Sequence, residues 1–252
     1  MSLTIKVMSY NIHYGVDNDG RLNLRSIADV IREEDPDLVG LQEVDRHWSE
    51  RSGFIDEAGW LSGCLGMRHV FAANLERDPP KKGAPRRQYG TAVLSKYPIT
   101  RAVNYKLSSF GMEQRGLLET CIDVAGTCLH FYNVHLGLTE QQRDRQVSEI
   151  LSVLKSSCGL QILAGDLNAQ PDSKELRRLL DGFLHDALAG DDEAFTFPAL
   201  KPNRRIDYIL YSSGIKVDGA RVVEAAVSDH RPVVALCTFE NAGKGKNWRD
   251  RP

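Results

Sequence analysis

Residues 129–168 read LHFYNVHLGLTEQQRDRQVSEILSVLKSSCGLQILAGDLN, and this stretch decides the fold. It opens and closes with apolar runs that end at polar residues, His135 in the first run and Asp166 and Asn168 in the second. Apolar residues recur at helical spacing between the runs, which predicts a strand, a helix and a second strand. Thr139 is placed to cap this helix. The apolar face of the helix consists of Val147, Ile150, Leu151 and Leu154.

The chain contains an earlier copy of this organisation. The motif YNVH at residues 132–135 is preceded by YNIH at residues 10–13, and each copy is followed by a helix-like interval of similar length that leads to Glu43 or Asp166. The first interval has its own apolar helical face and ends near a proline. That face consists of Leu24, Ile27, Val30 and Ile31. We therefore predict a pseudo-two-fold molecule with two related layers.

The remaining pattern predicts many short strands and few helices. Strands are expected at residues 90–97, 116–125, 127–135, 206–212 and 232–239. Helices are expected at residues 24–34, 57–65, 140–155 and 173–180. This combination favours the α/β (α+β) class, with two packed sheets covered by helices. The sequence offers no linker between two cores, so we predict one domain over residues 1–240 and a flexible tail over residues 241–252.

Composition sets the outer limits. The chain has 252 residues with 42% hydrophobic content, no apolar run of membrane-spanning length and no secretory signal, which predicts a cytoplasmic globular protein. The net charge of −2 does not favour non-specific binding of duplex DNA. Residues 76–89 are basic, and we interpret them either as a solvated loop or as a loop that binds substrate phosphates. Five cysteines without a CxxC pair predict reduced thiols rather than a disulfide framework or a zinc site.

Six apolar runs end at residues suited to metal binding, acid–base chemistry or phosphate binding. A carboxylate within a buried strand is costly unless it is paired, and six such endings are hard to explain by packing. If these strand ends converge, they form one site. The residues concerned are Asn11, Glu43, His135, Asp166, Asn168, Asp207, Asp229 and His230.

Glu43 is the candidate metal ligand, with Asp229 and Asn11 as partners. Mg²⁺ is typically held by one or two carboxylates plus substrate phosphate, so one well-placed glutamate suffices. Mn²⁺ is a substitute metal. The alternative for Glu43 is a strand-end carboxylate paired with an arginine.

Asp166 and Asn168 carry the candidate proton chemistry. Two positions apart in an extended segment, they face the same side, so Asp166 could take a proton from water while the Asn168 amide donates to a phosphoryl oxygen or fixes Asp166. An Asx turn is the structural alternative. Asp207 is the proposed partner of His230, where it would fix one tautomer and favour the imidazolium, although a purely structural pair would look the same.

Other polar residues admit two interpretations. Arg115 could clamp a phosphate or serve a structural role, and Thr196 and Phe197 could line a cleft or pack in a loop. The remaining histidines receive a non-catalytic interpretation, least firmly His13. Motifs of P-loop, dinucleotide, zinc-protease and serine-hydrolase chemistry are missing from the sequence.

The motifs YNIHYG, LQEVD, YGTAVLSKYPI, RGLLET, NVHLG, GDLNAQP, RRIDYIL and SDHRPV together resemble the endonuclease/exonuclease/phosphatase family, over about residues 6–239. The resemblance implies a four-layer α/β-sandwich of the DNase I-like type and Mg²⁺-dependent cleavage of phosphoesters. It also implies that Glu43 binds the metal, that Asp166 activates water, and that Asp229 is a metal ligand or a nearby acid. The residues implied to contact the phosphate are Asn11, His135, Asn168 and His230.

Departures from the family pattern narrow the expected function. His13 stands where some DNA-repair members carry an acidic residue, and the motifs are shorter than those of inositol-polyphosphate members. We therefore expect a phosphodiesterase acting on a small or lipid-like diester, with specificity in loops 45–60, 76–89, 108–116 and 190–204. A nuclease, a phosphomonoesterase and a catalytically inactive binding module are the competing interpretations.

Overall fold

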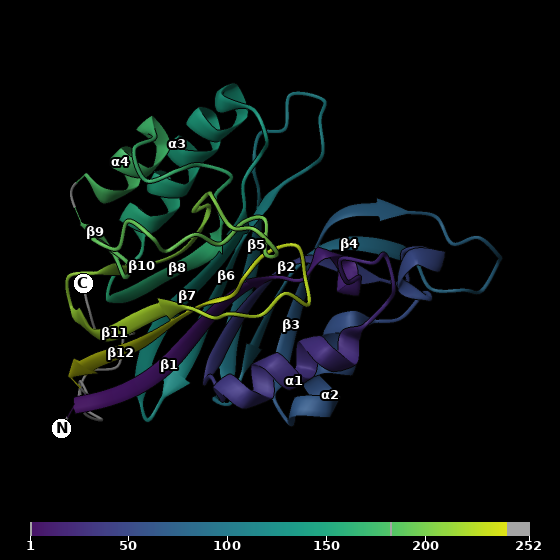
Figure 1. Cartoon of the computed structure of the whole chain (residues 1–252), viewed down its shortest axis with the longest axis horizontal. Coiled ribbons are helices and arrows are strands. Elements are labelled where there is room, and N and C mark those ends of the chain that lie inside the picture. The colour runs from purple at the N-terminus through teal and green to yellow at the C-terminus, as the bar shows by residue number, and fades with distance from the viewer. Residues whose placement is uncertain (1, 182, 241–252) are drawn as a thin grey trace.

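The computed structural model describes residues 2–181 and 183–240 (Figure 1). The first half comprises β1 (Ser2–Asn11), η1 (His13–Gly15), α1 (Leu24–Glu34), β2 (Leu38–Arg46), η2 (Glu50–Ser52), α2 (Glu57–Leu65), β3 (Arg68–Arg77), β4 (Arg87–Ser95), β5 (Ile99–Lys106) and β6 (Gly116–Val124). The second half comprises β7 (Thr127–His135), α3 (Glu140–Ser156), β8 (Leu160–Asp166), α4 (Lys174–Leu180), β9 (Leu184–Asp186), β10 (Asp207–Ser212), β11 (Ile215–Val222) and β12 (Val233–Glu240).

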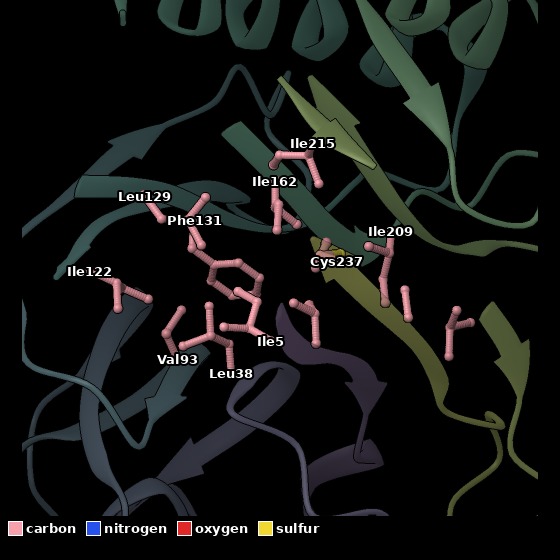
Figure 2. Packing of buried hydrophobic residues seen from close by; sticks show 14 of the residues in the cluster. Ile5, Leu38, Val93, Ile122, Leu129, Phe131, Ile162, Ile209, Ile215 and Cys237 are labelled. Carbon is pink, nitrogen blue, oxygen red and sulfur yellow. The ribbon is translucent and has the colours of Figure 1, made fainter. Parts of the chain in front are cut away.

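The described strands form two six-stranded sheets. Their orders are β11-β12-β1-β2-β4-β3 and β5-β6-β7-β8-β10-β9. The inner faces of the two sheets share one apolar core, in which Ile5 and Val93 of the first sheet lie with Phe131 and Ile162 of the second (Figure 2). Helices α1 and α2 cover the outer face of the first sheet, and α3 and α4 cover the second (Figure 1). The predicted four-layer α/β-sandwich is therefore confirmed.

Each sheet contains one parallel pair joined by a helix. In the first sheet β1 pairs with β2 across α1, and in the second β7 pairs with β8 across α3, whereas the other pairings are antiparallel. The two strands of a parallel pair have their carboxyl ends on the same side of the sheet. The polar residues that end β1 and β2, and those that end β7 and β8, therefore lie close together. This arrangement is the structural basis of the sequence repeat.

The predicted helices agree closely with the structure. Helix α3 begins with a capping box in which Thr139 accepts the Gln142 N–H and Gln142 reaches back to the Thr139 N–H. The face of α1 differs slightly, because Ala28 is fully buried where Val30 is half-buried.

Four strands were missed by the sequence pattern, namely β3, β5, β9 and β11, and each lies at the edge of a sheet. An edge strand pairs on one side only and tolerates exposed charged residues, so its sequence lacks a clear apolar run. β11 (IKVDGARV) also contains a register shift between Val217 and Gly219.

The cysteine prediction was partly wrong. Cys121 and Cys128 form a disulfide across the β6–β7 hairpin, with their Cα atoms 6.0 Å apart. The tight hairpin turn places these two residues at diagonal positions of the adjacent strands, since Cys121 pairs with His130 and Cys128 with Asp123, and spacing rules based on CxxC do not detect this. Of the free thiols, Cys237 is buried, Cys64 is half-buried and Cys158 is exposed.

No helix in residues 2–181 and 183–240 is long and apolar enough to cross a membrane. The predicted tail over residues 241–252 lies outside the described residues.

Candidate active site

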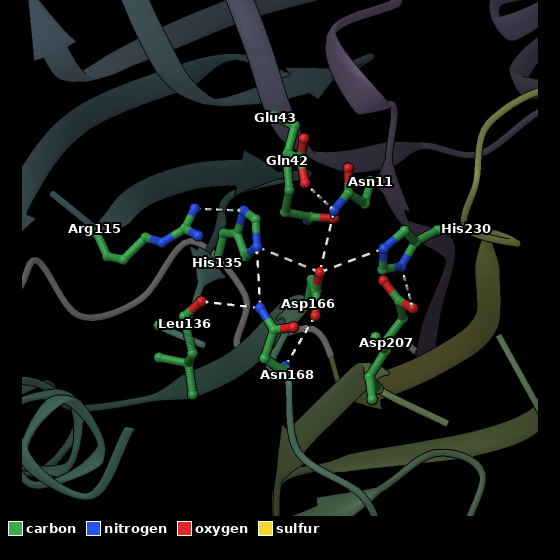
Figure 3. Close-up of polar contacts among 12 residues, drawn as sticks. Asn11, Gln42, Glu43, Arg115, His135, Leu136, Asp166, Asn168, Asp207 and His230 are labelled. Carbon is green, nitrogen blue, oxygen red and sulfur yellow. Dashed lines mark hydrogen bonds and ion pairs between the residues drawn. The ribbon is translucent and has the colours of Figure 1, made fainter. Parts of the chain in front are cut away.

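The polar residues that the sequence predicts at strand ends lie close together where the central strands of the two sheets end (Figure 3). Asn11 ends β1, His135 ends β7 and Asp166 ends β8. Asp207 begins β10 and pairs directly with Asp166 in the sheet. His230 follows from the loop before β12, and the hydroxyl of Ser228 in that loop donates to the Asn11 carbonyl at 2.8 Å.

Glu43 reaches this edge through an irregularity in β2. The register between β2 and β4 shifts between Leu41 and Val44, and Glu43 has a left-handed backbone with φ of 54°. Such a bulge redirects a side chain that regular pleating would place elsewhere. The carboxylate accepts a hydrogen bond from Asn11 Nδ2 at 3.1 Å and lines the cavity described below, rather than pairing with an arginine.

Asp166 is the buried centre of the site, with 1% of its surface exposed. Its Oδ1 accepts the Asn168 N–H at 2.9 Å, and its Oδ2 accepts from Asn11 Nδ2 at 3.1 Å. Oδ2 also lies 3.4 Å from His135 Nε2 and 3.7 Å from His230 Nε2. Burial and the neighbouring Asp207 raise the pKa of Asp166 to about 7, against the opposing effect of His230 and the two donors. The carboxylate can therefore exchange a proton near neutral pH.

His230 is held by two carboxylates. Its Nδ1 lies 2.9 Å from Asp207 Oδ2, which is fully buried, and its Nε2 faces Asp166. Burial alone would lower the pKa of His230, but Asp207 and Asp166 outweigh burial and raise it to about 10. The ring is thus an imidazolium, and Phe197 packs against it with ring centroids 4.7 Å apart.

His135, in contrast to His230, is uncharged. Burial, Arg115 and His230 hold its pKa well below the usual value, so the ring is neutral. Arg115 Nη1 lies 2.9 Å from His135 Nδ1. Because a guanidinium only donates, Nδ1 must accept, and the ring proton is on Nε2.

The side chain of Asn168 lies beside His135. Its Nδ2 donates to the Leu136 carbonyl at 3.0 Å, which fixes the orientation of the amide, and lies 3.2 Å from His135 Nε2. Both nitrogens are donors in this state, so they do not bond to each other. His135 Nε2 faces the Asp166 carboxylate at 3.4 Å, and both His135 and Asn168 line the cavity described below. A phosphoryl oxygen in that cavity would suit donors of this kind.

Two groups of residues offer metal ligands. Asp166, Asp207 and His230 have ligand atoms within 4.8 Å of one another, and the buried Asp207 Oδ1 has no hydrogen-bond partner among the described residues. His230 is protonated, however, and the protons on its ring nitrogens compete with a metal for those nitrogens. Glu43 and Asp229 supply carboxylate oxygens to the cavity, and His13 Nδ1 lies 3.9 Å from Asp229 Oδ1. A hard oxygen donor set of this type fits Mg²⁺ better.

The site opens into a cavity of about 670 Å³. All four loops predicted from the sequence contribute to its wall, with Trp48 and Arg51, Arg77 and Tyr89, Glu113 and Arg115, and Phe197 and Arg204. Phe197 lines the cavity, which is one of the two interpretations left open by the sequence. Thr196 is instead fully buried, and its hydroxyl accepts the Ile206 and Asp207 N–H groups at 3.2 and 3.3 Å.

Sequence reasoning missed the aromatic and cationic part of this wall. Arg51 is bonded through two nitrogens to the buried Asp45 at 2.8 and 2.9 Å, and its guanidinium lies 3.7 Å from the centre of the Tyr14 ring. The Arg77 guanidinium lies 4.7 Å from the Trp48 ring. Aromatic residues within otherwise polar loops were the available signal. His13 also lies nearer to the site than its non-catalytic interpretation implied, because it faces Asp229.

The fold and the cluster of carboxylates, imidazoles and amides define a hydrolase of phosphoester bonds. A model of the endonuclease/exonuclease/phosphatase family matches residues 8–230, and the chain belongs to this family. Members of the family hydrolyse phosphoester bonds and generally depend on a divalent metal, so this protein is an enzyme of that kind.

Named relatives and a solved structure support the assignment to this family. The uncharacterized protein YbhP of Escherichia coli K12 is 28% identical over 270 residues, which cover 92% of this chain and 95% of YbhP. A putative neutral sphingomyelinase of Drosophila melanogaster is 28% identical over 202 residues, covering 71% of this chain and 42% of the relative. The crystal structure of an endonuclease/exonuclease/phosphatase from Beutenbergia cavernae has a TM-score of 0.78 at 25% identity, over 95% of this chain and 72% of that one.

Proposed function

We propose that the protein is a Mg²⁺-dependent phosphodiesterase in which Asp166 removes the proton from the attacking water. The observation that carries the proposal is the position of Asp166, buried between a protonated His230 and a neutral His135. Hydrogen bonds from Asn168 and Asn11 fix both carboxylate oxygens, so the base is held in one orientation. A fixed base next to a fixed cation is suited to a reaction that creates negative charge.

The phosphate would be bound by the donors that surround this base. The His135 Nε2–H and Asn168 Nδ2–H groups, whose nitrogens lie 3.2 Å apart, would donate to phosphoryl oxygens, and the His230 imidazolium would supply positive charge on the other side of Asp166. Arg115 holds the His135 tautomer, and its buried Nε, which lacks a partner among the described residues, could donate to substrate. In this role Asp207 keeps His230 charged and oriented.

Glu43 and Asp229 would hold the metal. Asn11 donates to Glu43 and Asp166, and its Oδ1 accepts the His13 N–H at 3.1 Å. This arrangement favours a role for Asn11 in positioning the two carboxylates over direct coordination. When bound, Mg²⁺ would polarise the phosphoryl group and offset its developing charge.

A diester, small or lipid-like, is the proposed substrate, and residues 1–240 are the proposed single catalytic domain. The test is hydrolysis of bis(p-nitrophenyl) phosphate and p-nitrophenyl phosphate with Mg²⁺, with Mn²⁺ and with EDTA. Diester cleavage that requires the metal and exceeds monoester cleavage is expected. Faster release of inorganic phosphate from the monoester would identify a phosphomonoesterase instead.

A nuclease and a non-catalytic binding module would each give a different result. Nicking of plasmid DNA at 0.15 M salt at a higher specific rate than diester cleavage would identify a nuclease. Metal binding by calorimetry without turnover of any of these substrates would favour a non-catalytic module.

A further inference from the structure

Four large apolar side chains are unusually exposed around the cavity. Phe110 and Met112, in the β5–β6 connection, are 55% and 49% exposed. Leu138, just before α3, is 67% exposed, and Leu200 is 65% exposed. We call these four residues the apolar rim. Single exposed leucines need no explanation, but a group of them at the mouth of one cavity marks a binding surface.

The apolar rim borders the mouth from two sides. Leu138 is itself part of the cavity wall. Gln142 Nε2 donates to the Ser109 carbonyl at 3.1 Å, which fixes the loop carrying Phe110 and Met112 against the start of α3, beside Leu138. Leu200 lies on the opposite loop, between Phe197 and Arg204, which both line the cavity.

A basic hairpin flanks the same mouth. The β3–β4 hairpin, the protrusion at the right of Figure 1, carries five basic and two acidic residues over residues 76–88. Arg77 and Tyr89 at its base line the cavity, and Lys81 and Lys82 at its tip are exposed. Arg86 pairs with the two acidic residues at 3.6 and 3.4 Å, so the excess positive charge is concentrated at the tip.

We propose that this mouth docks on an anionic lipid surface. The apolar rim would enter the boundary between headgroups and acyl chains, and Lys81 and Lys82 would contact anionic headgroups. The inference rests on the proposed diesterase function, since it identifies the substrate as a phosphodiester in a lipid headgroup. The basic loop noted in the sequence then has a role outside the catalytic cluster.

A lipid surface accounts for both the apolar rim and the basic hairpin. A nucleic acid duplex would use the basic hairpin, because its phosphate backbone binds lysine and arginine, but its paired and stacked bases are not free to pack against exposed Phe110 and Leu200. A membrane interface combines negative headgroups with apolar chains only a few ångströms deeper.

The test is co-sedimentation of the full chain with vesicles of phosphatidylcholine alone or with 30% phosphatidylglycerol. Binding to the anionic vesicles is expected. Lys81→Glu/Lys82→Glu should weaken it at least about thirtyfold, since each basic residue near such a surface contributes roughly a fivefold gain in affinity and the introduced carboxylates are repelled. Phe110→Asn/Leu200→Gln should weaken it at least tenfold, and asparagine tolerates the left-handed backbone at position 110.

Matched controls are Lys155→Glu/Lys216→Glu for charge and Trp60→Gln for exposed apolar surface, all outside the mouth. The controls should bind vesicles as the parent does. Equal binding by the control and mouth variants, failure of the parent to bind anionic vesicles, or binding to duplex DNA in preference to vesicles would overturn the proposal.

Hydrolysis of soluble bis(p-nitrophenyl) phosphate separates this inference from the proposed function. The mouth variants should keep parental rates on the soluble diester, since none of the changed side chains lines the catalytic cluster. Vesicle binding without soluble diester cleavage would contradict the phosphodiesterase assignment and the identification of a lipid diester substrate, whereas cleavage without vesicle binding would contradict the docking surface alone.

Discussion

Backbone conformation distinguishes the residues of this site. Glu43 and Asn168 have left-handed φ angles of 54° and 49°, and His13 and Tyr14 have 46° and 44°. Such conformations cost roughly 1–3 kcal/mol for residues other than glycine, and they tend to persist where the surrounding structure enforces them. The sequence does not reveal them, because none of these positions is a glycine. Among the described residues, these are four of the nine positions other than glycine with such a φ angle.

Substitutions at Asn168 can distinguish the contribution of its backbone conformation from that of its side-chain amide. Asn168→Gly keeps the left-handed backbone but removes the amide donor, so we predict a normal melting temperature and a fall in kcat of roughly 10²–10³-fold. Thermal unfolding and steady-state kinetics on the diester check this.

Asn168→Ala is the matched control. It should lose the same activity and, in addition, about 1 kcal/mol of stability, since alanine disfavours this φ. If Asn168→Gly retains parental kcat, the amide does not act on substrate.

At the scale of elements, the sequence predicted the central strands and the helices and missed the four edge strands. Runs such as those ending at His135 and Asp166 are buried on both faces, so apolar character alone identifies them. β5 (ITRAVNYK) has one exposed side and mixed polarity, and its pairing with β6 is determined by tertiary contact. Similarly, Glu43 was identified from its place after an apolar run, but the bulge that aims it could not be predicted.

That bulge gives a prediction for metal binding. Glu43→Ala should raise the Mg²⁺ concentration needed for half-maximal activity by at least tenfold, because one of the two proposed carboxylate ligands would be lost. A titration of diester hydrolysis with Mg²⁺ measures it, and excess Mg²⁺ should recover part of the rate. Glu33→Ala on the exposed side of α1 is the control and should leave the titration unchanged. An activity loss that no Mg²⁺ concentration reverses would point to a structural role.

At the scale of the molecule, the sequence repeat has diverged in role. Asn11 holds two carboxylates of the site, whereas its counterpart Asn133 joins the sheets. Asn133 Nδ2 donates to the carbonyls of Leu41 and Ala92 at 2.8 Å each, and its Oδ1 accepts from Gln42 at 2.7 Å. The repeat predicted two related layers correctly but could not show which asparagine serves the site.

Asn133→Ala should therefore destabilise the fold. Two buried carbonyls and one buried amide lose partners, so the free energy of unfolding should fall by about 2–4 kcal/mol. Urea denaturation measures this, with the surface variant Asn18→Ala as the comparison. A loss below that of Asn18→Ala would show that the contact between the sheets does not depend on Asn133.

The convergence of the site was predictable because it follows from topology. The parallel pairs place Asn11 beside the end of β2 and His135 beside Asp166, and the packing of the two sheets brings these pairs together. The aromatic wall and the exposed rim come from loops, whose conformations depend on contacts such as that of Arg51 with Asp45. The catalytic residues could thus be predicted from the sequences of the strands, whereas the substrate could not be predicted from those of the loops.

The most direct test of the central claim is the rate of metal-dependent diester hydrolysis by Asp166→Asn beside Asp123→Asn. Asp123 also accepts a backbone N–H, in the β6–β7 turn, but it is only half-buried and lies outside the cavity, so it controls for an Asp→Asn change away from the site. We predict that Asp166→Asn folds normally and loses activity by roughly 10²–10⁴-fold, the contribution of general base catalysis, while Asp123→Asn retains the parental rate. Parental activity in a correctly folded Asp166→Asn would contradict the account.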